Sequence, residues 1–145
     1  MQQAQLQQRV EQISQQFFKR PFLHQATFNK RLRSSGGRYL LQTHNLEFNS
    51  KMLAEHGLET LDGIIKHELC HYHLHLLKRG YRHCDADFKQ LLKQVEGLRY
   101  APTLKENQPQ LQYVCQKCQQ VYWRKRQVDV KRYVCARCHG KLVLK

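Results

Sequence analysis

The chain has 145 residues, with 25 lysines and arginines against 11 aspartates and glutamates, which gives a formal net charge of +14 at pH 7. This length supports one modest hydrophobic core and a small appendage. No run approaches the roughly 18 apolar residues that a membrane-spanning helix requires, so no membrane partner is expected, whereas the charge favours polyanions.

The N-terminal third predicts one helix followed by short strands. Residues 1–16 are polar and rich in glutamine, unlike a signal peptide, so we expect a cytoplasmic protein. Apolar residues recur every three or four positions, as in an amphipathic helix, at Leu6, Val10, Ile13 and Phe17. Extended patterns follow at residues 26–33, 38–43 and 46–49, with a turn expected at residues 34–37, and they predict a small antiparallel meander.

Residues 51–56 predict a short helix, and the next segment predicts a helix of about 18 residues, from Thr60 as N-cap to a stop at Gly80. It contains the sequence His-Glu-Leu-Cys-His at residues 67–71. Histidines four positions apart lie on one helix face and can bind one zinc ion, while Glu68 can act as a general base. The alternative is a polar face with two solvated histidines, but the helical context favours zinc. Cys70 is expected to be a buried packing residue.

A catalytic zinc usually takes three protein ligands, so a third is expected beyond the end of this helix. His73 points to another face, and His75 would lie about 12 Å from His67 at 1.5 Å per residue, so both are expected on the rim or surface. His83 follows Gly80, where the chain can turn back, and is favoured over three acidic alternatives: Asp85, Asp87 and Glu96.

Residues 85–95 predict a last helix, and residues 101–110, with two prolines, predict a linker. We therefore expect a domain over residues 1–104 and a linker and tail over residues 105–145. In the tail, two C-x2-C pairs are separated by sixteen residues, a spacing typical of a four-thiolate zinc ribbon: Cys115, Cys118, Cys135 and Cys138. A reducing cytosol disfavours disulfides, and a closed shell leaves no position for water, so this zinc would be structural.

The tail also holds 10 basic and 2 acidic residues. Basic residues 124–126 follow Tyr122 and Trp123, and basic residues 131–132 precede Tyr133, with short strands expected around residues 113–114, 121–123 and 133–134. Such interleaving could follow a phosphate backbone and stack on bases, so DNA or another nucleic acid is a candidate partner. The alternative is a solvated basic hairpin whose aromatic residues form the ribbon's core.

Together these features resemble the SprT-like metalloproteases over nearly the whole chain. The resemblance rests on residues 67–72, 80–88 and 36–38 and on the four tail cysteines. It implies an α+β fold, in which a minimal zincin-like domain of helices and a small antiparallel sheet precedes a C-terminal zinc ribbon. It also implies that the third ligand is a histidine after the motif helix, which corresponds to His83. Related Spartan proteases cleave proteins crosslinked to DNA.

The leading hypothesis is a zinc-dependent metalloprotease that hydrolyses peptide bonds, with DNA-associated proteins as candidate substrates. One catalytic Zn²⁺ would be held by His67, His71 and His83, with Glu68 as the general base, and one structural Zn²⁺ by the tail cysteines. Tyr81 or Arg82 could stabilise the oxyanion, and residues 46–49 could offer a strand edge to an extended substrate. The alternative is a nucleic-acid-binding zinc protein without proteolytic activity.

Overall fold

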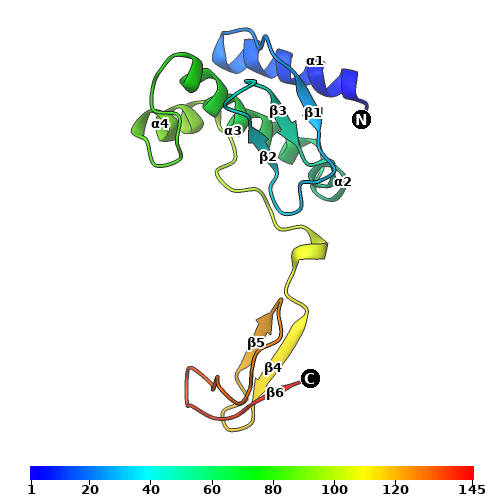
Figure 1. Ribbon diagram of the computed structural model, residues 1–145, viewed down its shortest axis with the longest axis vertical. Coiled ribbons are helices and arrows are strands. Elements are labelled where there is room, and N and C mark those ends of the chain that lie inside the picture. The colour runs from blue at the N-terminus through cyan, green and yellow to red at the C-terminus, as the bar shows by residue number, and fades with distance from the viewer. The chain divides into compact units, whose positions relative to one another are not determined.

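The computed structural model describes residues 1–145 and divides them into two compact units, Met1–Leu104 and Lys105–Lys145. Unit 1 combines helices with a three-stranded sheet, and unit 2 holds a second three-stranded sheet (Figure 1). The four tail cysteines belong to unit 2. The α+β class expected from the sequence is therefore confirmed. None of the helices has the length and apolar content needed to cross a membrane.

The helices of unit 1 follow the predicted periodicities. α1 (Gln3–Ile13) buries Leu6, Val10 and Ile13 and continues as a π-helical turn over Ser14–Phe18. Phe17, predicted to continue the stripe, is exposed, and Phe18 is buried in its place, because the π-helical turn changes the period. α2 (Ser50–His56) is capped by Asn49, whose side chain accepts a hydrogen bond from the Lys51 N–H at 3.1 Å. α3 (Leu58–Leu76) carries the His-Glu-x-x-His sequence and ends before Gly80, and α4 (Ala86–Val95) follows Asp85.

The sheet of unit 1 is mixed, so the predicted antiparallel meander is wrong. Its strands β1 (Ala26–Phe28), β2 (Gly37–Tyr39) and β3 (Leu46–Phe48) have the order β1-β3-β2. β3 pairs in parallel with β1 and antiparallel with β2. The segment between β1 and β2 is no hairpin turn, because these two strands do not pair with each other. The Asn49 side-chain amide holds this segment at the end of β3 by donating hydrogen bonds to the carbonyls of Leu32, Arg33 and Ser35.

The two edges of this sheet differ. Along β1, the Gln7 side chain of α1 makes hydrogen bonds that a neighbouring strand would otherwise make. It accepts from the Ala26 N–H at 2.7 Å and donates to the His24 carbonyl at 2.8 Å. The edge of β2 is open. The segment 46–49, expected from the sequence to offer an edge, is instead occupied on both sides, because β3 is the central strand.

The backbone pattern shows which groups the open edge presents. The Leu40 N–H donates to the Asn45 carbonyl at 3.0 Å, and the Asn49 N–H donates to the Gly36 carbonyl at 2.8 Å. Hydrogen-bonded and non-hydrogen-bonded positions alternate in an antiparallel pair. Gly37 and Tyr39 therefore direct their N–H and C=O groups away from β3, toward the open edge.

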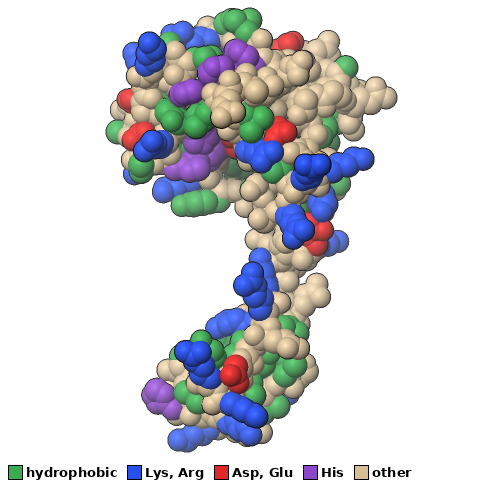
Figure 2. Space-filling view, in the orientation of Figure 1, with side chains coloured by type: hydrophobic (Ala, Val, Ile, Leu, Met, Phe, Trp, Pro, Cys, Tyr) green, Lys and Arg blue, Asp and Glu red, His purple; other side chains and the backbone are tan.

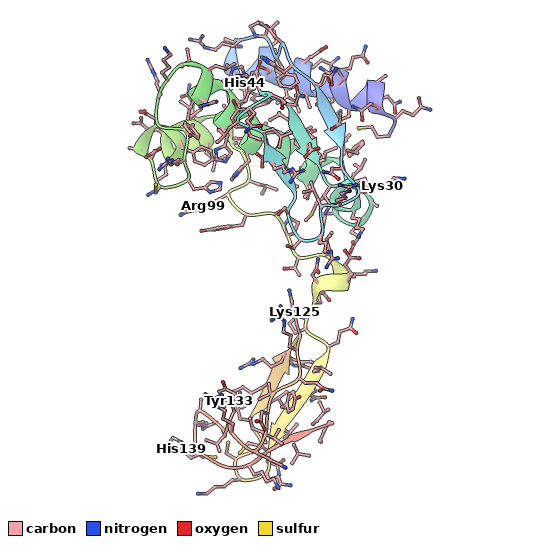
Figure 3. All side chains as sticks on the ribbon, in the orientation of Figure 1. Lys30, His44, Arg99, Lys125, Tyr133 and His139 are labelled. Atoms are coloured by element: carbon pink, nitrogen blue, oxygen red, sulfur yellow. The ribbon has the colours of Figure 1, made fainter.

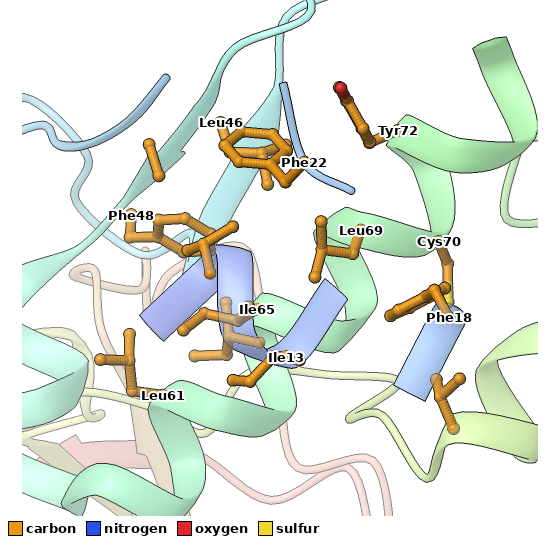
Figure 4. Packing of buried hydrophobic residues seen from close by; sticks show 14 of the residues in the cluster. Ile13, Phe18, Phe22, Leu46, Phe48, Leu61, Ile65, Leu69, Cys70 and Tyr72 are labelled. Atoms are coloured by element: carbon orange, nitrogen blue, oxygen red, sulfur yellow. The ribbon is translucent and has the colours of Figure 1, made fainter. Parts of the chain in front are cut away.

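The core of unit 1 lies between α1, α3 and the sheet (Figure 4). Phe48, Ile65 and Leu69 are fully buried, and α4 adds Phe88 from the other side of α3. At the surface, the Arg9 guanidinium forms a bidentate ion pair with the Asp62 carboxylate and ties α1 to α3. This packing fixes α3 from several sides, and α3 carries the candidate ligands.

Unit 2 is a small antiparallel sheet of order β5-β4-β6, with β4 (Leu111–Cys115) in the centre. It is preceded by a single 3₁₀ turn over Lys105–Asn107. β5 (Val121–Arg124) was expected, whereas the strand predicted at residues 133–134 is absent and β6 (Leu142–Leu144) takes its place. The buried cluster of this unit consists only of Cys115, Cys135 and Leu142. So small a core cannot stabilise the unit without a further contribution.

Candidate metal centres

Three histidine side chains of unit 1 converge on one point. His67 and His71 lie one turn apart on α3, and His83 comes from the loop before α4. The Nε2 atom of His83 lies 2.9 Å from that of His67 and 3.0 Å from that of His71, and the α3 pair is 3.3 Å apart. Two nitrogen ligands of a tetrahedral zinc ion, with bonds of about 2.0–2.1 Å, lie about 3.3 Å apart, so the three atoms fit one ion.

Backbone carbonyls orient two of these rings. The Nδ1 atom of His67 lies 2.7 Å from the Leu98 carbonyl oxygen, and that of His71 lies 2.5 Å from the Tyr81 carbonyl oxygen. Because a carbonyl can only accept, each Nδ1 must carry the proton, which leaves the Nε2 lone pair free for a metal. Burial lowers the pKa of His67 and lowers that of His71 to about 4, so these two rings are neutral, as metal binding requires, at pH 7.

The loop that presents His83 is shaped by Asp85 and Asp87, two of the acidic alternatives to His83 as a ligand. The Asp85 carboxylate accepts from the Arg82 N–H at 3.0 Å, and the Asp87 carboxylate accepts from the Gly80 N–H at 3.0 Å. Neither acid belongs to the histidine group, and Glu96 also lies outside it. These carboxylates therefore hold the loop, while His83 reaches the two α3 histidines.

Gly63 allows Leu98 to approach α3. The Leu98 N–H donates to the Gly63 carbonyl at 3.1 Å, and a Cβ atom at Gly63 would lie 2.6 Å from Leu98 Cγ. The position of the Leu98 carbonyl, which orients His67, therefore depends on the absence of a side chain at Gly63, four positions before His67. The sequence gives no sign of the roles of the Leu98 and Tyr81 carbonyls, because every residue has a backbone carbonyl.

A Gly63→Ala change is expected to weaken zinc binding at the histidines about 10- to 100-fold, the usual effect of losing an outer-shell partner. Competition against a chelator of known affinity measures the two sites of the chain separately. Adding Leu98→Ala removes the colliding Cγ atom but keeps the carbonyl, so the double variant should recover affinity. Unchanged affinity in Gly63→Ala would contradict this role of Leu98.

Glu68 lies at the floor of an open cleft of about 930 Å³, next to the histidines. Its side chain is only 6% exposed, and burial raises its pKa to about 8. A Cβ atom at Gly37 would lie 3.2 Å from Glu68 Cγ and 2.9 Å from the Glu47 carbonyl oxygen, so β2 passes directly beside this carboxyl group. The cleft is lined by residues 34–39 and Leu41 on the β2 side, and by Tyr81, His83, Phe88, Lys89, Leu92 and Lys93 on the α4 side. Residues 96–101, which follow α4, also line it and lead back to Gly36, since a Cβ atom there would lie 2.9 Å from Ala101 Cβ.

Two other histidines of α3 stay outside the group, as expected from helix geometry, but a surface position is wrong for His73. That side chain is 4% exposed, and its Nε2 atom lies 2.7 Å from the Ser14 hydroxyl, which donates to the Arg20 carbonyl at 2.7 Å. Ser14 is the distant partner that makes burial of this imidazole possible. His75 is half-buried, and its Nδ1 lies 2.5 Å from the Tyr39 hydroxyl.

The four tail cysteines form a second candidate centre, and no disulfide joins them. The Sγ atoms of Cys115 and Cys138 are 3.4 Å apart, and those of Cys118 and Cys135 are 3.6 Å apart. The two C-x2-C turns are equivalent in backbone: the N–H of the residue after each pair donates to the carbonyl of its first cysteine, at 3.0 and 2.8 Å. Two matching turns thus bring four sulfurs to one point.

The surroundings of two of these sulfurs, those of Cys115 and Cys135, favour thiolates, whereas the neighbouring sulfurs raise the pKa of the Cys138 thiol. The Tyr122 hydroxyl donates to Cys135 Sγ at 3.2 Å and lowers the pKa of this thiol to about 6. Two backbone N–H groups, of Lys117 and Cys118, donate to Cys115 Sγ at 3.4 Å each. A Cβ atom at Gly140 would lie 2.7 Å from Cys115 Sγ, so only glycine fits there. Four thiolates would complete a tetrahedral zinc shell, which is the arrangement of a structural site.

Known proteins share this sequence over almost its full length. The SprT-like family model matches residues 6–112. The chain is 55% identical over 139 residues to the "Protein SprT-like" of Enterococcus faecalis, which covers 94% of this chain and 91% of that protein. It is 52% identical over 145 residues to the protein of the same name in Bacillus subtilis, covering 98% and 97% of the two chains. No solved structure matches. The chain therefore belongs to the SprT-like family.

Proposed function

We propose that this chain is a zinc-dependent metalloprotease that hydrolyses peptide bonds, with a minimal zincin-like domain in unit 1 and a zinc ribbon in unit 2. The observation that supports this most is the convergence of three histidine Nε2 atoms beside the buried Glu68 in an open cleft. Three protein ligands leave a coordination position open, which is typical of catalytic zinc sites.

The chemistry divides between the ion and Glu68. His67, His71 and His83 would hold the zinc ion, which would supply Lewis acidity that makes water more acidic and polarises the carbonyl group. Glu68 accepts a proton from the attacking water and delivers it to the leaving nitrogen. Burial raises the pKa of this carboxyl to about 8, and a cation held by the histidines would lower it, toward the range that suits both accepting and returning a proton.

The open edge of β2 offers a place for the substrate backbone. Gly37 and Tyr39 direct unpaired N–H and C=O groups toward it, and an extended peptide could add to the sheet there. Because Gly37 lies directly beside Glu68, a peptide paired with this strand would pass over the general base. Of the two residues considered for the oxyanion, Tyr81 lines the cleft and Arg82 does not, which favours Tyr81.

A Gly37→Ala change is expected to lower kcat by about 100-fold, because misplacement of reacting groups by about 1 Å has effects of this size. The new Cβ atom would press on the Glu47 carbonyl and Glu68 Cγ, so either the strand or the base must shift. Steady-state kinetics on a peptide substrate measures this effect, with zinc content and melting temperature as controls. Normal kcat would mean that β2 can move without disturbing Glu68.

The proposal is tested by loading the full chain with zinc and following cleavage of an unfolded protein such as casein by mass spectrometry. Two zinc ions per chain are expected, and chelation should stop cleavage while added zinc restores it. A protein with two ions that leaves unfolded, DNA-bound and DNA-crosslinked proteins intact would overturn the assignment as a protease.

A second candidate function, nucleic-acid binding by unit 2, is favoured by its exposed aromatic residues. Trp123 and Tyr133 are 52% and 54% exposed, so they form no part of the ribbon's core, and the Arg132 guanidinium lies 5.6 Å from the centre of the Tyr133 ring (Tyr133 and Lys125 are labelled in Figure 3). Binding to single-stranded DNA should weaken steeply with salt, because phosphate contacts release counterions. If DNA-crosslinked proteins are the substrates, this surface would bring the protease to them. Affinity that does not depend on salt would contradict this role.

A further inference from the structure

One wall of the cleft carries a surplus of positive charge. Lys89 and Lys93 lie one turn apart on α4, and Arg99 follows in the segment after it, and all three are exposed and line the cleft. They take part in neither of the ion pairs Arg9–Asp62 and Arg38–Glu47. Lysine and arginine side chains gather near the histidine patch on the face of unit 1 seen in Figure 2. The acidic residue of this wall is Glu96, which leaves an excess of two cations.

The opposite wall is nearly neutral. Its one charged residue, Arg38, pairs with Glu47, the residue opposite it on β3, and the others are serine, glycine, tyrosine and leucine. The positive potential of the cleft is therefore concentrated on the α4 side. Field lines are focused in a cleft with low-dielectric walls, so these charges act more strongly on a bound group than on an open surface.

The spacing of the two lysines suits an extended chain. Residues four apart on a helix are separated by about 6 Å along its axis. Alternate residues of a strand point to the same side and are separated by about 6.6 Å. A peptide paired with β2 would direct every second side chain toward the α4 wall, which Phe88 and Leu92 line together with the two lysines.

We infer that the cleft selects peptides with acidic side chains at alternate positions near the scissile bond, bound by Lys89, Lys93 and Arg99. The inference rests on the proposed peptidase function. A glutamate fits this surface because its carboxylate can reach the exposed cations of the α4 side. Peptide is favoured over nucleic acid because the facing strand edge presents both N–H and C=O groups, and a phosphate backbone has no N–H to give to those carbonyls.

The test measures binding and cleavage separately. A Glu68→Gln chain loaded with zinc is titrated with fluorescent peptides that are identical except for two alternate glutamates, glutamines or lysines. The glutamate peptide is expected to bind at least about 10-fold more tightly than the glutamine peptide, and the lysine peptide least. Digestion of a peptide library by the unmodified chain should show acidic residues enriched at the same alternate positions.

Reversing the charge of the two lysines tests whether they determine the preference for acidic peptides. Lys89→Glu/Lys93→Glu should reverse the order of the glutamate and lysine peptides. Lys30→Glu/Arg31→Glu changes the net charge equally but lies outside the cleft, and should leave the order unchanged (Lys30 and Arg99 are labelled in Figure 3). Equal binding of the three peptides would overturn the inference, and so would tighter binding of an oligonucleotide at these lysines.

The outcomes separate the two proposals. Cleavage without any acidic preference would leave the proposed peptidase function in place and remove only the inference about specificity. Charge-selective binding by the Glu68→Gln chain, with no cleavage by the unmodified chain, would support the acidic-peptide site and overturn the peptidase.

Discussion

A Glu68→Gln chain is expected to keep both zinc ions and to lose about 100- to 10,000-fold in kcat, the range attributed to general acid–base catalysis. Glutamine has nearly the same shape but cannot accept a proton from water. The rings of His67 and His71 are held by the Leu98 and Tyr81 carbonyls, so the ligand geometry does not depend on this side chain. Peptide cleavage and zinc content, measured on the same sample, test both parts.

Glu59→Gln is the matched control, because Glu59 lies on the same helix but is exposed and outside the cleft. It should retain full activity. Substantial hydrolysis by zinc-loaded Glu68→Gln would exclude Glu68 as the general base, and loss of zinc from this variant would show that the carboxylate supports the ligands.

The Glu68→Gln substitution is also expected to change the stability of unit 1. The pKa of Glu68 is raised to about 8 in the folded chain, above its ordinary value near 4.5, so its contribution to stability is lost as pH rises through this interval. With the histidine site free of metal, Glu68→Gln should therefore stabilise unit 1 by about 3 kcal/mol at pH 7 and about 4 kcal/mol at pH 8, at 1.36 kcal/mol per pKa unit. Urea denaturation at several pH values measures this, and the difference should vanish near pH 4.

The second large effect is expected in the ribbon. Cys115→Ser should remove one zinc ion and unfold unit 2, because structural zinc contributes about 10–16 kcal/mol in small zinc domains. The buried cluster of only three residues cannot replace that contribution. Zinc counting and limited proteolysis are the measurements, with one ion and an intact fragment near residues 1–104 as the expected result.

Cys84→Ser is the control for this change, since Cys84 is exposed and belongs to neither ligand group. It should retain both ions. If Cys115→Ser left the chain without any zinc, the histidine group would not hold an ion by itself, and the case for a hydrolase would fail.

The sequence predicts best what depends on local spacing. The 3.6-residue period places His67, Glu68 and His71 on one helix, and the matching C-x2-C turns bring four sulfurs together. His83 could be favoured because a glycine precedes it, but its contact with the α3 histidines depends on carboxylates that fold the loop, which no spacing rule gives.

Long-range features could not be predicted in the same way. Gly36 and Gly37 suggested a turn, yet a Cβ atom at Gly36 would lie 2.8 Å from Ile64, and one at Gly37 would press on Glu68 Cγ. These glycines serve close packing, and strands of three residues are too short to show which neighbour they pair with. His73 shows the same limit, because its burial depends on a hydroxyl 59 positions away.

The two ligand sets also differ in how firmly they would hold the same metal. Four thiolates bring four negative charges to zinc, whereas three neutral imidazoles bring none and leave a position to solvent. When zinc becomes scarce, we therefore expect the histidines to release their ion first, while the ribbon stays folded. The chain would then remain folded but inactive, so its activity would depend on the zinc concentration in its surroundings.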